Sequence, residues 1–273
     1  MQVADDIPGP LADCGRVADV QRVDSADGTP IAYREFGSGE PIVFVHGVGT
    51  SGADWTFVAP HLRDHFTVVA MDRRGRGASG DGREYAMARE AEDVLAVLDA
   101  VDGELLVGHS YGGLCSILAA ERTDRLRRLV IYEPPIAVTE ARAGRLDELV
   151  ARGDLDAALE GFLRGAGTPD DQLDAIRSSP AWPVLLDAVP VVPRELHAAA
   201  AWQNPAGPIE VPTLHLLGAD TDNPSYLNGL NELEAAFPDW RRESIPGQRH
   251  IGHVFAAPVF AELVADFCGA KSA

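Results

Sequence analysis

Short apolar runs separated by amphipathic segments set the pattern of this chain. Residues 20–23 and 30–36 are expected to form two short strands on either side of Asp27-Gly28, a turn signal that predicts a hairpin. Further along, continuously apolar runs are typical of parallel strands buried on both faces. These runs are residues 41–45, 66–71, 104–108, 128–132 and 213–217.

Helical segments lie between these runs. Residues 87–100 gather four apolar positions on one helical face, namely Val94, Leu95, Val97 and Leu98. Residues 110–122 form a second helical segment directly after the run at 104–108. Strands that alternate with helices of this length predict βαβ units, and therefore a parallel sheet covered by helices on both faces.

The alternation stops between residues 134 and 208. This stretch is rich in Ala, Leu, Arg and Asp, carries several prolines and contains no strand-like run, which predicts short helices joined by proline turns. Ordinary connecting helices are one interpretation. We favour a helical cap over the carboxyl edge of the sheet, because the insert is too long for a single crossover. The expected organisation is a flexible segment at 1–19 and one domain at 20–273 that contains the cap.

Charge and cysteine content narrow the choice of partners. Asp and Glu total 42 against 23 basic residues, a formal net charge of −19. So acidic a surface argues against nucleic acid and anionic membranes as partners.

The three cysteines, Cys14, Cys115 and Cys268, have neither CxxC nor metal-ligand spacing. With no signal-peptide-like or membrane-spanning run either, we expect a cytoplasmic protein that acts on a small molecule without metal or cofactor. The sequence does not indicate an oligomeric state.

The strongest chemical signal is Gly108-His-Ser-Tyr-Gly112, a G-x-S-x-G motif. It stands between a predicted strand and a predicted helix, the context in which this motif presents a nucleophilic serine on a strained turn. Side chains at Gly108 or Gly112 would clash in so tight a reversal. Ser110 is therefore the expected nucleophile, and the N–H of Tyr111 at the helix start is an expected oxyanion donor.

Two glycine-rich loops follow predicted strands upstream of this motif. His46-Gly-Val-Gly49 comes after the run at 41–45, and its Val48 N–H is the expected second oxyanion donor. Asp72-Arg-Arg-Gly-Arg-Gly-Ala-Ser79 follows the run at 66–71. It lacks the G-K-[ST] of a phosphate loop, so we interpret it as a shaped loop beside the site.

A base and an acid complete the candidate chemistry. His250, just past a strand-like run at 241–245, is the expected base, with His253 the weaker alternative. The acid needs a loop at the carboxyl edge of the sheet. Three carboxylates satisfy this condition: Glu133 ends the run at 128–132, and Asp220 and Asp222 follow the run at 213–217.

These motifs, in this order, resemble the α/β-hydrolase family from about residue 20 to the C-terminus. The resemblance implies an eight-stranded, mostly parallel sheet flanked by helices, a helical cap at 134–208, and a serine–acid–histidine triad. The family usually places its acid three residues after the glycine that ends the fifth of these runs, and here that position is Thr221. Some members place the acid at the end of the preceding strand, where Glu133 stands. We favour Glu133, with Asp220 as the alternative.

Hydrolysis of a carboxylic ester or related acyl bond is the function that these residues favour. A serine at position 110 argues against the epoxide hydrolases and haloalkane dehalogenases, which resemble this fold but need an aspartate nucleophile. Carbon–carbon bond hydrolases and cofactor-free haloperoxidases stay open, because they share the triad. A non-hydrolytic binding protein or biosynthetic enzyme is the alternative from another class, and Thr221 at the usual acid position counts in its favour.

Overall fold

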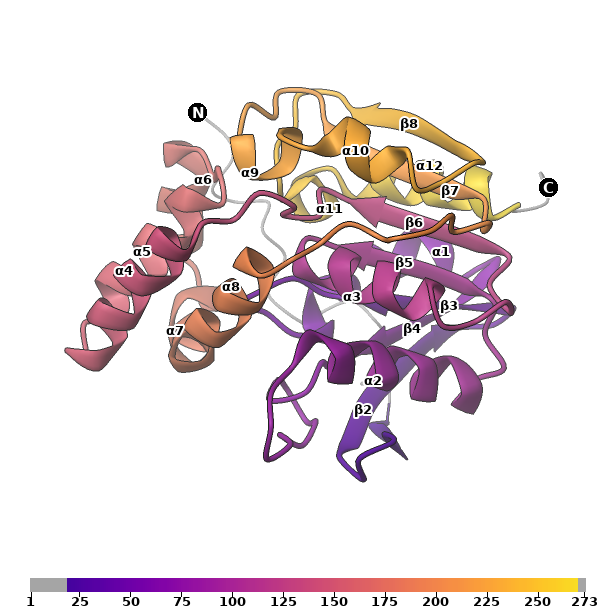
Figure 1. Ribbon diagram of the computed structural model, residues 1–273, viewed down its shortest axis with the longest axis horizontal. Helices are drawn as coiled ribbons and strands as arrows, with labels where there is room; N and C mark the ends of the chain where they lie inside the picture. Colours follow the sequence, from indigo (N-terminus) through magenta and orange to yellow (C-terminus); the bar gives the residue numbers. More distant parts are fainter. Residues whose placement is uncertain (1–18, 270–273) are drawn as a thin grey trace.

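The computed structural model describes residues 19–269, which are built around one eight-stranded sheet (Figure 1). Most of the predicted segment 1–19, and the last four residues of the predicted domain, lie outside the described residues. In chain order the strands are β1 (Gln21–Asp24), β2 (Pro30–Gly37), β3 (Glu40–Val45), β4 (Phe66–Met71), β5 (Leu105–His109), β6 (Arg128–Tyr132), β7 (Thr213–Gly218) and β8 (Trp240–Ile245).

The sheet is mostly parallel, as predicted. Its strand order is β1-β2-β4-β3-β5-β6-β7-β8. Only the pairs β1–β2 and β2–β4 are antiparallel, and every other neighbouring pair is parallel. The predicted hairpin joins β1 to β2, where Gly28 takes a φ of +80° and the Asp27 carboxylate accepts the Thr29 N–H at 3.0 Å.

Helices cover both faces of the sheet. On one face lie α2 (Met87–Ala100), α3 (Tyr111–Ala120) and α10 (Leu230–Glu234). On the other lie α1 (Ala59–Leu62), α11 (Gly252–Phe255) and α12 (Ala257–Cys268). Two short elements remain in the loops: the 3₁₀ turn η1 (Gly52–Thr56) and the helix α9 (Pro224–Leu227).

Two apolar layers hold these helices to the sheet, because successive side chains of a strand point to opposite faces. Val43 of β3 packs with Val94 of α2 in one layer. Its neighbour Ile42 packs with Leu62 and Phe260, from α1 and α12, in the other layer. The continuous apolar runs of the sequence thus supply both cores at once, which is why the central strands carry so few polar residues.

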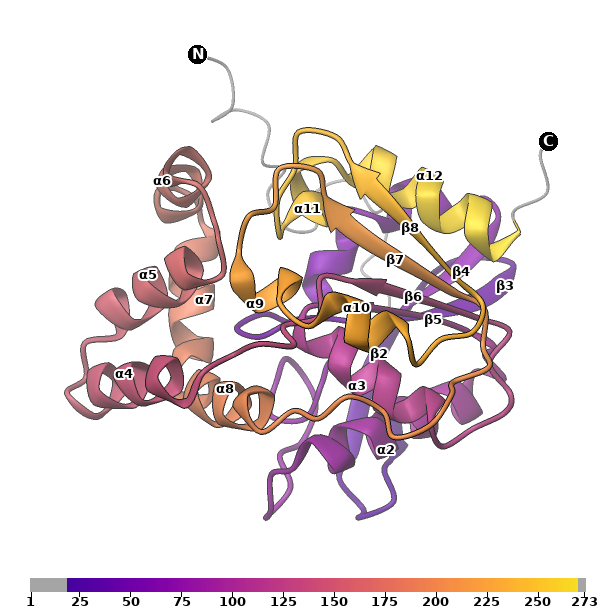
Figure 2. The same ribbon diagram turned by 45° about the horizontal axis from the view of Figure 1, so that its top comes forward.

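Between β6 and β7 the chain leaves the sheet and forms a group of helices. They are α4 (Glu140–Ala151), α5 (Leu155–Gly165), α6 (Asp170–Ser178), α7 (Ala181–Ala188) and α8 (Val192–Ala200), with the 3₁₀ turn η2 (Val189–Val191) between the last two. Figure 2 shows this group beside the sheet, at the end where the parallel strands finish. These helices occupy the segment 134–208 for which a helical cap was predicted, and we call α4–α8 the cap.

Candidate active site

Ser110 occupies a strained turn between β5 and α3. Its φ of 54° and ψ of −126° lie in a region that residues with a side chain rarely adopt. Glycines on either side make the turn possible. A Cβ atom on Gly108 would lie 2.4 Å from Ser116 Oγ, and one on Gly112 would lie 2.3 Å from the Val45 carbonyl oxygen. The predicted need for small neighbours is therefore met, and the turn lifts the Ser110 hydroxyl above the sheet.

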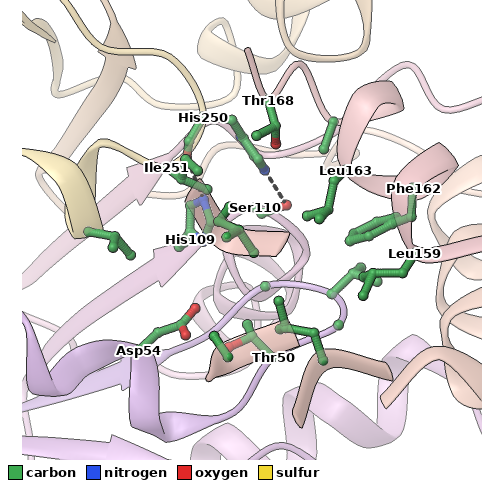
Figure 3. A pocket seen from close by; sticks show the side chains of 18 of the residues that line it. Thr50, Asp54, His109, Ser110, Leu159, Phe162, Leu163, Thr168, His250 and Ile251 are labelled. Atoms are coloured by element: carbon green, nitrogen blue, oxygen red, sulfur yellow. Dashed lines mark hydrogen bonds between the residues drawn. The ribbon is translucent and has the colours of Figure 1, made fainter. Parts of the chain in front are cut away.

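His250 meets this hydroxyl from the loop between β8 and α11. Its Nε2 atom lies 3.0 Å from Ser110 Oγ (Figure 3). Two neighbours hold the imidazole in place. The Tyr226 ring of α9 stacks on it at 4.2 Å with an interplanar angle of 10°, and His109 Nε2 donates to the His250 carbonyl oxygen at 2.9 Å. The base is thus fixed through both its ring and its backbone.

Glu133 is the carboxylate that the structure brings to His250. Its Oε2 atom lies 2.9 Å from His250 Nδ1. Its Oε1 atom accepts the Gly218 N–H at 2.7 Å and the Thr221 hydroxyl. The chain Ser110–His250–Glu133 is therefore continuous, and every carboxylate oxygen in it has a partner.

The other two candidate acids are not part of this chain. The loop after β7 turns both Asp220 and Asp222 outward, so both are exposed to solvent. The Asp222 carboxylate pairs with Arg249 instead of a histidine. The expectation that Asp220 is the alternative acid is not met by this geometry, because its backbone N–H is tied to the Gln248 carbonyl at 2.9 Å while its side chain faces water.

Burial shifts the protonation equilibrium of His250. Desolvation lowers the pKa of His250 below its ordinary value, and the neighbouring Glu133 carboxylate opposes this shift only in part. Neutral imidazole is the form that can accept a proton, so the lowered pKa keeps His250 in its basic form near neutral pH.

The two expected oxyanion donors lie beside Ser110. Tyr111 is the first residue of α3, where N–H groups have no partner within the helix. Val48 follows Gly47, and a Cβ atom on Gly47 would be only 3.0 Å from Ser110 Cβ. Within residues 19–269 neither N–H donates to a backbone carbonyl outside a helix or strand. Both are thus available to a bound oxygen.

Arg73 supports the loop that carries Val48. This side chain is fully buried, and its Nη1 atom donates to the Gly47 carbonyl oxygen at 2.9 Å. Its Nη2 atom bonds Glu90 of α2 at 2.9 Å and Glu195 of α8 at 2.5 Å. Glu195 also bonds Arg76 at 2.6 Å. The predicted shaped loop at 72–79 therefore links the cap, through buried ion pairs, to the loop beside Ser110, through the hydrogen bond of Arg73 to Gly47.

Comparison with known proteins identifies the family. The profile of the alpha/beta hydrolase family matches residues 42–263, which is most of the chain. The chain belongs to this family. The crystal structure of an alpha/beta hydrolase from Sphaerobacter thermophilus is 34% identical to it with a TM-score of 0.74, over 89% of this chain and 99% of that one.

Two curated relatives match a shorter part of the chain. N-formylmaleamate deformylase of Pseudomonas putida is 34% identical over 125 residues, 44% of this chain and 47% of the relative. 2-Hydroxy-6-oxo-2,4-heptadienoate hydrolase of Pseudomonas putida is 35% identical over 122 residues, 42% of this chain and 44% of the relative. The chain thus spans somewhat less than half the length of the curated relatives it matches.

In this member of the alpha/beta hydrolase family an apolar cavity of about 150 Å³ opens at Ser110 and His250. Its walls come from the cap, the loop after β3 and the segment around α11 (Figure 3). Phe162 and Leu185 of the cap line the cavity. Trp182 packs within the cap, where its Nε1 atom donates to the Asp156 carboxylate of α5 at 2.9 Å.

Within the described part of the chain, no group of three or more His, Cys, Asp or Glu side chains is arranged to hold a metal ion. In the same residues, no helix combines the length and the apolar character needed to cross a membrane.

The supporting roles of Tyr226, Thr221 and Arg73 were not predicted from the sequence. Tyr226 lies in the short helix α9 and Thr221 in the loop after β7, where no periodic pattern marks either residue. Arg73 belongs to a loop that was recognised, but its partner Glu195 is 122 residues away in the sequence. A contact between residues so far apart leaves no trace in a single sequence unless a motif marks each of them.

Proposed function

We propose that this protein hydrolyses a carboxylic ester or related acyl bond of a small molecule through an acyl-enzyme on Ser110. The observation that supports the proposal most directly is the hydrogen-bonded chain from Ser110 Oγ through His250 to Glu133, with separations of 3.0 and 2.9 Å. We expect a cytoplasmic enzyme that needs neither metal nor cofactor.

In the acylation half, His250 Nε2 takes the hydroxyl proton while Ser110 Oγ attacks the carbonyl carbon of the substrate. The carbonyl oxygen becomes an oxyanion, which the N–H groups of Val48 and Tyr111 stabilise. His250 then gives its proton to the oxygen of the departing alcohol. The carbon–oxygen bond breaks, and the acyl group stays on Ser110.

In the deacylation half, His250 takes a proton from water, and the resulting hydroxide attacks the acyl carbon. The second oxyanion collapses, His250 returns the proton to Ser110 Oγ, and the carboxylic acid leaves. The Glu133 carboxylate accepts the hydrogen bond of the imidazole Nδ1–H, which fixes the tautomer of His250, and stabilises the imidazolium that forms in each half.

Cleavage of a carbon–carbon bond is a second candidate. It is favoured by the match to a relative named 2-hydroxy-6-oxo-2,4-heptadienoate hydrolase, at 35% identity. The substrate in that name is a carboxylate. Among the described residues that line the cavity at Ser110 there is no Lys or Arg to bind one. We therefore rank ester hydrolysis first.

The test is turnover of p-nitrophenyl acetate and butyrate, together with labelling by a fluorophosphonate. Ser110→Ala should abolish both, since loss of a catalytic serine costs about a millionfold in rate in a well-studied protease. Ser178→Ala is the matched control, because that serine is exposed on α6. A folded protein with neither turnover nor labelling would refute the proposal and favour a binding protein or a non-hydrolytic enzyme of this fold.

A further inference from the structure

Asp54 places a carboxylate in the wall of the cavity that contains Ser110. It belongs to η1, which is anchored because the Gly52 N–H donates to the Asp72 carboxylate at 2.9 Å. Figure 3 shows the Asp54 carboxylate directed into the space between Ser110 and Thr50. Asp54 is the only carboxylate among the described residues of that wall.

The Asp54 carboxylate has no hydrogen-bond donor among residues 19–269. Its one ion-pair contact among these residues is with His253, whose Nε2 atom lies 3.7 Å from Asp54 Oδ2, beyond hydrogen-bond distance. About a quarter of the side chain, 26%, is exposed. A carboxylate in an apolar wall is costly unless a partner compensates for lost water. The Asp54 carboxylate oxygens, which accept no hydrogen bond from these residues, face the cavity, where a bound molecule would lie.

The surroundings suit a positively charged partner. Three aromatic rings, Phe57, Phe162 and Phe255, line the same cavity. Ring faces attract ammonium groups, and quaternary ammonium ions are commonly recognised by aromatic side chains. The surface of the whole chain adds to this preference, since its formal net charge is −19.

A second cavity extends the first one beyond Asp54. It has a volume of about 390 Å³ and shares Asp54, Phe57 and Thr50 with the cavity at Ser110. Among the described residues that line it, Arg76 is the one arginine, and it is already paired with Glu195 at 2.6 Å and donates to the Ala188 carbonyl at 2.9 Å. Asp54 thus stands at the junction of the two cavities with its charge uncompensated by a neighbouring arginine.

We propose that Asp54 selects substrates that carry an ammonium group close to the bond that is cleaved. The selection of substrates rests on the proposed function, hydrolysis at Ser110. Binding of a cation at Asp54 does not depend on that reaction. Asp54 is therefore a specificity-determining residue rather than a member of the triad.

The kinetic test uses pairs of esters of the same shape that differ in charge. In the first pair the cation lies in the leaving group: acetylthiocholine is compared with the neutral 3,3-dimethylbutyl thioacetate. In the second pair the cation lies in the acyl group: the p-nitrophenyl ester of 4-(trimethylammonio)butyric acid is compared with the neutral p-nitrophenyl ester of 5,5-dimethylhexanoic acid. The quantity measured is the cationic-to-neutral ratio of kcat/KM in each pair.

Asp54→Asn should lower this ratio about tenfold in at least one pair, the size expected for a partly desolvated ion pair assisted by aromatic faces. Comparing this ratio between the wild type and the variant cancels any difference in intrinsic reactivity between the two esters of a pair. Asp64→Asn is the matched control, since Asp64 is exposed and lines neither cavity. Its ratio should equal that of the wild type. Equal ratios for Asp54→Asn and the wild type in both pairs would overturn the inference.

A binding measurement separates this inference from the proposed function. Titration calorimetry with butyltrimethylammonium is made on the Ser110→Ala protein, with and without Asp54→Asn. The inference predicts at least about tenfold weaker binding when Asp54 is replaced. Absence of binding, or equal binding, would refute the cation site even if esters are hydrolysed. Conversely, Asp54-dependent binding without fluorophosphonate labelling of Ser110 would support the cation site and refute the hydrolase.

Discussion

The Thr221 hydroxyl donates a hydrogen bond to Oε1 of Glu133, the carboxylate whose other oxygen contacts His250. Thr221 stands where members of the family usually carry their acid, so the loop after β7 still serves the imidazole, through a hydroxyl rather than a carboxylate. Gly218, the last residue of β7, donates its N–H to the same oxygen at 2.7 Å. Two donors, one at the end of β7 and one in the loop after it, therefore hold a carboxylate that follows the neighbouring strand β6.

Thr221→Val should reduce kcat about tenfold and leave KM little changed, because a hydrogen bond to a charged group is worth about 1.5–3 kcal/mol and Gly218 keeps part of the support. Thr221→Ser retains the hydroxyl and should restore most of the activity. Steady-state kinetics on a p-nitrophenyl ester measures both. Activity that is kept in Thr221→Val but lost in Thr221→Ser would mean that packing of the Thr221 methyl group, and not its hydrogen bond, matters.

Glu133→Gln removes the charge that stabilises the His250 imidazolium but keeps the shape of the side chain. The expected loss in kcat is about 10³–10⁴-fold, as for the corresponding change in serine proteases. Asp220→Asn is the matched control and should leave kcat unchanged, since Asp220 is exposed and has no contact with His250. If Asp220→Asn proved the more damaging variant, the acid would have to be reassigned.

Much of this fold could be predicted because its signals are local. Helix α2 spans Met87–Ala100, the range indicated by its apolar face, and β4 spans the range of its apolar run, Phe66–Met71. Ser110 and His250 could be found for the same reason, since each stands in a short motif between a strand and a helix. The structure places the two side chains 3.0 Å apart although 140 residues separate them.

The residues alone left the acid open, and Glu133 was favoured over Asp220 only through the resemblance to the family. Glu133 and Asp220 both follow strands of a parallel sheet, so both end at the same sheet edge. Only loop conformation decides between them: Glu133 takes a φ of 47° at the end of β6 and turns its side chain inward, whereas Asp220 faces solvent. Such backbone angles depend on packing around the loop, which a single sequence does not reveal.

The lowered pKa of His250 predicts the acid side of the pH–rate profile. The base must be neutral to act, so kcat/KM should fall with decreasing pH at a midpoint below the ordinary histidine value of about 6.5. Glu133 raises the pKa of His250 against the effect of burial, so Glu133→Gln should move the midpoint further down. For this slow variant the rate of fluorophosphonate labelling serves as the measure.

His197 supplies the control for this profile. It is an exposed cap histidine whose pKa is raised by hydrogen bonds with Asp147 and Glu140, and it contacts no triad residue. His197→Gln should leave the midpoint where it is. A wild-type midpoint above 6.5, or an upward shift in Glu133→Gln, would contradict the assignment of His250 as the base.

Glu195 offers a test of how the cap is fastened to the rest of the molecule. This carboxylate is fully buried on α8 and bonds both Arg73 and Arg76. Glu195→Gln keeps the volume but leaves two buried guanidinium groups with one fewer negative charge. Breaking a buried pair in this way costs about 3–5 kcal/mol, so the free energy of unfolding in urea should fall by that amount.

The matched control for this change is Glu160→Gln, also within the cap. Glu160 bonds Arg164 at 3.0 Å and Arg177 at 2.7 Å, but these partners are about half exposed, at 50% and 46%. Water screens and replaces such pairs, so the urea midpoint of Glu160→Gln should stay close to that of the wild type. Because Arg73 also holds the Gly47 carbonyl beside Ser110, Glu195→Gln should lower kcat/KM as well, whereas Glu160→Gln should not. Equal effects of the two variants on stability and turnover would show that burial of the Glu195 pair is unimportant, and that the cap is held by its apolar contacts alone.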